Sequence, residues 1–135
     1  MKRSTFLSLA ALIALAVGVF ALFSPVALLA SKGVSSAAAS VWTREVGVLL
    51  IAIGVIAFLV RNHEDSPTLQ AFFIGNVIVQ VGLFPIEILA YREGTITQLS
   101  GIVPNSILHL CLASAFTYYA MRMKPPRSTQ APSAA

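Results

Sequence analysis

The stretch AFFIGNVIVQVGLFPIEILAYREG, residues 71–94, is apolar as far as Tyr91 except for a few polar side chains and one acidic residue, Glu87. A helix needs about 20 apolar residues to cross a bilayer core of about 30 Å. Glu87 lies about one helical turn before the charged end of the stretch, and it follows Pro85, which lacks a backbone N–H. We therefore expect residues 68–91 to form a transmembrane helix whose Glu87 faces other helices instead of lipid.

The composition is that of a membrane protein. Of the 135 residues, 57% are hydrophobic and 10% are charged, whereas soluble domains carry about 25% charged residues. The net charge is +4, but the basic residues flank apolar runs, so we expect no nucleic-acid binding. The single cysteine, Cys111, excludes an internal disulfide framework and a multi-cysteine metal site, and we expect no metal ion or cofactor.

Three more apolar segments complete the pattern, at residues 6–30, 41–60 and 101–121. Short polar connections separate them, and they lack the alternation of barrel strands. The sequence thus predicts an all-α fold in which residues 1–124 form one bundle of four transmembrane helices with short loops. Residues 125–135 are rich in Pro, Ser and Ala and are predicted to form a disordered cytoplasmic tail.

The first segment and the orientation need separate consideration. MKR before the segment and ALLA at its end also fit a cleavable signal peptide, but a signal core is typically about 7–15 residues, so we expect a retained span. With the N-terminus inside, the inner side holds Lys2, Arg3, Arg61, Arg122, Lys124 and Arg127, and the outer side holds Lys32, Arg44 and Arg92. This bias predicts a bacterial inner-membrane protein with both termini in the cytoplasm.

Small residues predict where helices pack closely. Ala10, Ala14 and Gly18 share a stripe on the first span, although the abundance of alanine explains that stripe equally well. Gly47 and Gly54 share one on the second span. Small side chains let helix backbones approach each other in lipid, where no hydrophobic force drives association.

Polar and ionisable residues gather toward one end of the bundle. Asn76, Gln80 and Glu87 are spaced to share one face of the third span, and Asn105 and His109 share a face of the fourth. We therefore predict a polar pocket open to the outside, in which Glu87 faces Arg44 and His109. The candidate pocket residues are Arg44, Glu45, Glu87, Asn105 and His109, with Asn76 and Gln80 as interhelical polar contacts.

Prolines occur at the same depth. We expect Pro25 and Pro85 to bend their helices and leave room for a hydrated pocket, and Pro104 belongs to the same outer portion. The alternative is that the polar residues only join the helices, or that Arg44 extends to the headgroups.

Three segments carry a resemblance to a known family: VWTREVGVLLIAIGVIAFLVRN (residues 41–62), FFIGNVIVQVG (72–82) and SILHLCLASAFTYYAMR (106–122). They resemble the small four-helix bacterial membrane proteins of the broad DoxX-like group. The corresponding positions are Arg44, Gly47, Asn76 and His109. The resemblance implies a small membrane protein, and some members of the group are accessory subunits of membrane redox complexes.

Two classes of function follow from these observations. The favoured one is a non-enzymatic membrane protein, either an accessory subunit of a larger assembly or a binder of a lipophilic ligand such as a lipid or quinone. The alternative is a membrane enzyme that acts on a lipid, quinone or terpenoid with Glu87 or His109 as acid or base. The expected partners are membrane lipids and a larger complex or further copies of the chain.

Overall fold

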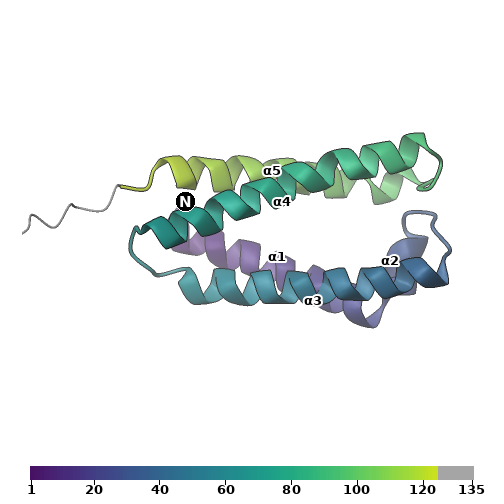
Figure 1. Ribbon diagram of the computed structural model, residues 1–135, viewed down its shortest axis with the longest axis horizontal. Coiled ribbons are helices and arrows are strands. Elements are labelled where there is room, and N and C mark those ends of the chain that lie inside the picture. Colours follow the sequence, from purple (N-terminus) through teal and green to yellow (C-terminus); the bar gives the residue numbers. More distant parts are fainter. Residues whose placement is uncertain (125–135) are drawn as a thin grey trace, which may run out of the picture.

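The fold is all-α, as predicted, in a computed structural model that describes residues 1–124 (Figure 1). The helices are α1 (Arg3–Phe23), α2 (Pro25–Ala30), α3 (Ala37–Val60), α4 (Pro67–Arg92) and α5 (Val103–Met121), with a 3-10 turn, η1 (Leu99–Gly101), before α5. Four segments, α1, α3, α4 and η1–α5, are long and apolar enough to cross a membrane. The chain is thus a small multi-pass membrane protein. The predicted tail, residues 125–135, lies outside the described residues.

The helices form two antiparallel hairpins that lie as two layers (Figure 1). α1 packs along α3, with α2 at their junction, and α4 packs along α5. One end of the bundle, here called the terminal end, carries the N-terminus, the α3–α4 loop and the end of α5. The other end, here called the α2 end, carries α2 and the α4–α5 loop.

Serine caps determine where α3 and α4 begin. Ser36 Oγ accepts a hydrogen bond from Ala39 N at 3.2 Å, and Ser66 Oγ accepts one from Leu69 N at 3.1 Å. Each bond satisfies one of the N–H groups that a helix leaves free at its start. For this reason α3 begins at Ala37, earlier than the expected residue 41.

The prolines lie at different positions within the helices. Residues 6–30 form two helices instead of one, because the chain breaks at Ser24 and Pro25 starts α2 at the first position, which suits its fixed φ. Pro104 likewise lies at the start of α5. Pro85 is the proline inside a helix, and α4 continues past it to Arg92.

Glycines allow α1 and α3 to touch along their backbones. A Cβ on Gly18 would lie 2.8 Å from Gly47 O, and a Cβ on Gly47 would lie 2.8 Å from Gly18 O. Gly54 meets α1 at Ala11, whose carbonyl oxygen is 3.1 Å from a Cβ built there. The predicted stripe on α3 is therefore confirmed. On α1, the residues that contact this stripe are Ala11 and Gly18, which are seven positions apart.

An aromatic cluster joins the two hairpins at the terminal end. Phe6 of α1 packs edge-on against Phe116 of α5, with ring centroids 4.9 Å apart, and stacks on Tyr119 at 5.1 Å. Phe73 of α4 lies 5.5 Å from Phe116. Phe6, Phe73 and Phe116 are buried. Because aromatic pairs gain energy from their geometry, this cluster can hold the layers together where lipid supplies no hydrophobic drive.

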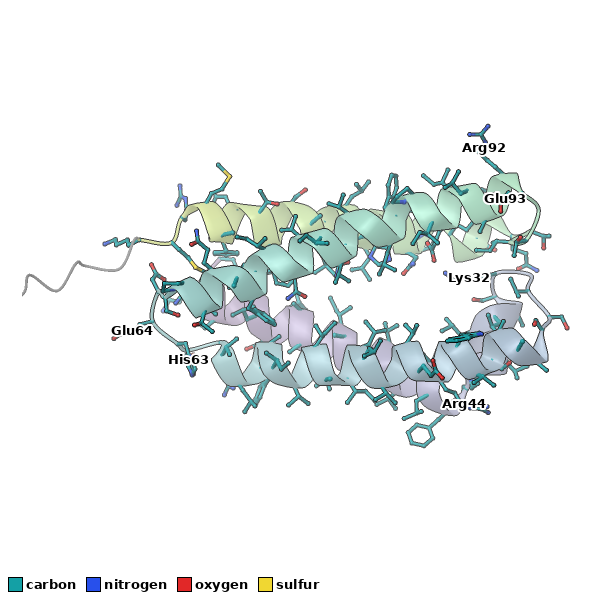
Figure 2. All side chains as sticks on the ribbon, in the orientation of Figure 1. Lys32, Arg44, His63, Glu64, Arg92 and Glu93 are labelled. Atoms are coloured by element: carbon teal, nitrogen blue, oxygen red, sulfur yellow. The ribbon has the colours of Figure 1, made fainter. Side chains whose placement is uncertain are left out.

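Polar contacts reinforce the terminal end where the spans begin and end. Arg3 forms an ion pair with Asp65 in the α3–α4 loop, and Lys124 N donates to Asp65 Oδ2 at 3.0 Å. The backbone N–H of Lys124 and then the Arg3 guanidinium hold the pKa of the Asp65 carboxyl below its usual value. His63, in the same loop, is exposed (Figure 2).

The close contact at Gly47 predicts that replacing glycine by alanine has opposite effects on stability at two positions, Gly47 and Gly75. Gly47→Ala places a methyl group against the backbone of α1 and should lower stability in detergent by about 1–3 kcal/mol, as overpacking does. Gly75→Ala is the matched control, because a Cβ there meets nothing within 4 Å. It should raise helix stability by about 0.5–1 kcal/mol. Equal shifts in thermal unfolding of the two variants would contradict the contact.

Candidate functional site

A cavity of about 530 Å³ lies between the two hairpins. Every α-helix contributes to its lining, and most of the lining side chains are aliphatic. Representative wall residues are Ile13 and Val17 of α1, Leu50 and Ile53 of α3, Leu83 of α4 and Leu108 and Leu112 of α5. The cavity therefore has the apolar character expected of a space between membrane helices.

Five polar side chains line one part of this cavity and form a continuous chain of contacts, here called the polar network. Lys32, in the turn after α2, forms an ion pair with Glu87 Oε1 of α4. Asn105 Nδ2 of α5 donates to the same Glu87 oxygen at 2.8 Å and lies 3.0 Å from His109 Nε2. His109 Nδ1 lies 2.6 Å from Gln80 Oε1, back on α4. The polar network thus connects both hairpins.

The partners of His109 define its tautomer. Gln80 Oε1 can only accept a hydrogen bond, so His109 Nδ1 must donate. Asn105 Nδ2 can only donate, so His109 Nε2 must accept. The imidazole is therefore neutral in this network and carries its proton on Nδ1. Both of its ring nitrogens are occupied by protein groups.

The structure brings together Glu87, Asn105 and His109 from the predicted pocket, together with Gln80 (expected as an interhelical contact). The helical spacing explains this. Gln80 and Glu87 are seven positions apart on α4, and Asn105 and His109 are four apart on α5, so each pair presents one face. The two faces meet because α4 and α5 form one hairpin.

Asn76 behaves differently from the expected interhelical contact. Its Nδ2 donates to Phe72 O of its own helix at 2.9 Å. The side chain is buried and lines the cavity one turn away from Gln80. A bond to the carbonyl four positions earlier is locally available to a short polar side chain inside any helix, and here it is preferred over a partner on another helix.

The expected pair between Arg44 and Glu87 is wrong. Arg44 and Glu45 are exposed and do not line the cavity. Figure 2 shows Arg44 on the far side of the α1–α3 layer from α4, whereas Lys32 lies between the layers. The cause is the rotation of α3 about its axis. Gly47 faces α1, and the face of α3 that meets the cavity carries Thr43 and Leu50.

Lys32 belongs to the polar network but is not among the residues predicted for the pocket, because in the sequence it lies in a loop between two apolar segments. Its position depends on a turn at Gly33, whose φ is +72°, a conformation that favours glycine. The turn is fastened to the other hairpin by two hydrogen bonds, since Thr97 N and Gln98 N both donate to Lys32 O, at 3.0 and 3.3 Å. In the sequence, the feature that could have indicated this ion pair is that Lys32 is a basic residue expected at the same end of the bundle as Glu87.

Asn105 lies between Glu87 and His109 and bonds to both, so within residues 1–124 these two ionisable side chains do not bond to each other directly. In the same part of the chain, no group of three or more His, Cys, Asp or Glu side chains could hold a metal ion. What the site does offer is an apolar chamber with hydrogen-bonding groups gathered in one region.

No family model matches the chain, and no curated protein or solved structure matches it.

The Lys32–Glu87 pair predicts a measurable coupling. Both side chains are largely buried, at 18% and 12% exposure, so removing one partner strands the other charge. Glu87→Gln and Lys32→Met should each lower the free energy of unfolding in detergent by about 3 kcal/mol, which is the lower end of the cost of removing one partner from a buried ion pair. The double variant should lose clearly less than the sum.

Arg44→Gln serves as the control for this series and should change stability by less than about 0.5 kcal/mol, as exposed substitutions do. Thermal unfolding of the four variants measures the coupling. The prediction is contradicted if the stability losses of the Lys32 and Glu87 variants add up in the double variant, or if Arg44→Gln loses as much stability as they do. Either result would show that the Lys32–Glu87 pair does not hold the α2 end of the bundle together.

Proposed function

We propose that this membrane protein binds a lipophilic ligand in the cavity between its hairpins, with the polar part of the ligand against the polar network. The observation that carries the proposal is the combination of the cavity and the network in one space. Ligand sites typically enclose about 300–1,000 Å³, with mostly apolar walls and a few convergent polar groups. The cavity of about 530 Å³ falls in that range.

Access to the cavity runs sideways, between α3 and α4. Trp42 and Val46 of α3 line the cavity and are 67% and 49% exposed, and Ile86 of α4 lines it and is 60% exposed. Such residues form an open rim. Contacts between the hairpins close both ends of the bundle, through the aromatic cluster and through the Lys32 turn. A ligand would therefore come from the lipid and not from the aqueous phase.

The proposed setting is a bacterial cytoplasmic membrane with both termini in the cytoplasm. The excess of Lys and Arg near the termini supports this orientation, which places the polar network toward the outside. Retention of α1 is supported by its part in the core, since Phe6 and Leu7 are almost fully buried. We further propose kinship with the DoxX-like group, and membrane lipids, a larger complex or further copies of the chain as partners.

The test is to purify the full chain in a mild detergent and to identify co-purifying small molecules by native mass spectrometry. Ala14→Phe fills the cavity, because Ala14 lines it. Ala16→Phe adds the same side chain to an exposed position of the same helix that does not line the cavity. We expect the wild type and Ala16→Phe to carry a lipophilic molecule, and Ala14→Phe to carry about tenfold less.

Circular dichroism and thermal unfolding establish that both alanine variants are folded. A wild-type chain without any bound molecule, or an Ala14→Phe variant that keeps the same amount as the wild type, would rule out the cavity as the binding site.

A further inference from the structure

Three polar atoms on the cavity side of α4 are left without a protein partner. Within residues 1–124, Glu87 Oε2 is buried and has no hydrogen-bond partner. Asn76 uses its Nδ2 for Phe72 O, and Gln80 uses its Oε1 for His109. In the same part of the chain, Asn76 Oδ1 and Gln80 Nε2 have no hydrogen bond. Two of the three atoms are acceptors, and one is a donor.

The charges of the site are already balanced by the protein. Lys32 and Glu87 neutralise each other, and His109 is neutral in the tautomer that its partners impose. An anionic headgroup would meet the Glu87 carboxylate, and a cationic one would meet the Lys32 ammonium. Either would bring an uncompensated charge into an apolar chamber, which is costly. The site therefore favours an uncharged headgroup.

The unpaired atoms also require a particular hydrogen-bonding pattern. Asn76 and Gln80 both line the cavity from the same face of α4, four positions apart, so their side chains reach into the same part of it. A hydroxyl group can donate to Asn76 Oδ1 and accept from Gln80 Nε2. An ester, an ether or a quinone carbonyl only accepts, so it leaves Asn76 Oδ1 without a donor.

We propose that the ligand of this cavity is an uncharged lipid alcohol, whose hydroxyl group binds between Asn76 and Gln80 and whose hydrocarbon chain fills the aliphatic part of the chamber. This assignment rests on the proposed function, since it specifies the class of ligand for the same cavity. Trp42 provides a reporter, because it lines the cavity and is the single tryptophan of the chain.

The experiment measures quenching of Trp42 fluorescence in the delipidated full chain in detergent. Four probes share a dodecyl chain that carries a terminal bromine, and they differ in the headgroup: the alcohol, the methyl ether, the carboxylate and the ammonium. Ala14→Phe, with its filled cavity, gives the background from probe dissolved in the micelle. We expect the alcohol to quench the wild type at a concentration about tenfold lower than each of the other three.

Substitutions then locate the hydroxyl group. Asn76→Leu removes the acceptor, which the alcohol can use and the ether cannot, so it should bring the responses to alcohol and ether within about twofold of each other. Gln70→Leu is the control on the same helix, because Gln70 bonds to Ala120 O and does not line the cavity. It should keep the preference for the alcohol.

The outcomes separate the two proposals. Equal quenching by alcohol and ether, or stronger quenching by a charged probe, overturns the assignment of a lipid alcohol and leaves the binding of lipophilic molecules standing. An alcohol preference that survives in Asn76→Leu overturns the placement of the hydroxyl group and with it this assignment. Quenching no greater than that of Ala14→Phe for all four probes overturns both proposals.

Discussion

Lys32 joins the two hairpins at the α2 end through both its side chain and its backbone. Its ammonium group pairs with Glu87, and its carbonyl oxygen accepts from Thr97 N and Gln98 N. In lipid, no hydrophobic effect drives apolar helix surfaces together, so two layers of membrane helices need specific contacts such as these. At the terminal end the aromatic cluster around Phe6 has the same role. The cavity lies between these two points of attachment.

The same ion pair shapes the chemistry of the cavity. By neutralising Glu87 it leaves the chamber without net charge, and Asn105, which bonds to Glu87, also bonds to His109. Burying a hydrogen-bonded pair is tolerable in a low dielectric, whereas a lone charge is not. The protein thus combines an aliphatic chamber with polar groups that are mostly satisfied by one another. The unsatisfied atoms on Asn76 and Gln80 are the ones to which the proposed ligand would bind.

Much of the fold could be predicted, because its signals are local. Span lengths follow from the runs of apolar residues, and the shared faces of Gln80 and Glu87, and of Asn105 and His109, follow from the period of a helix. The close contact at Gly47 and Gly54 was also visible in the spacing of small residues. The break at Ser24 was only partly foreseen, since a proline within an apolar run can end a helix, as Pro25 does, or be carried inside one, as Pro85 is.

Composition and periodicity by themselves determined the class of protein, the number of spans and the residues that share a face on each helix. Only the tertiary structure decided which faces meet. The Gly18–Gly47 contact sets the rotation of α3, which turns Arg44 outward, and the Gly33 turn brings Lys32 to Glu87 instead. A sequence contains the angular position of each residue around its own helix. The rotation of one helix against another depends on side-chain packing between segments far apart in the chain, and this packing placed Lys32 where Arg44 was expected.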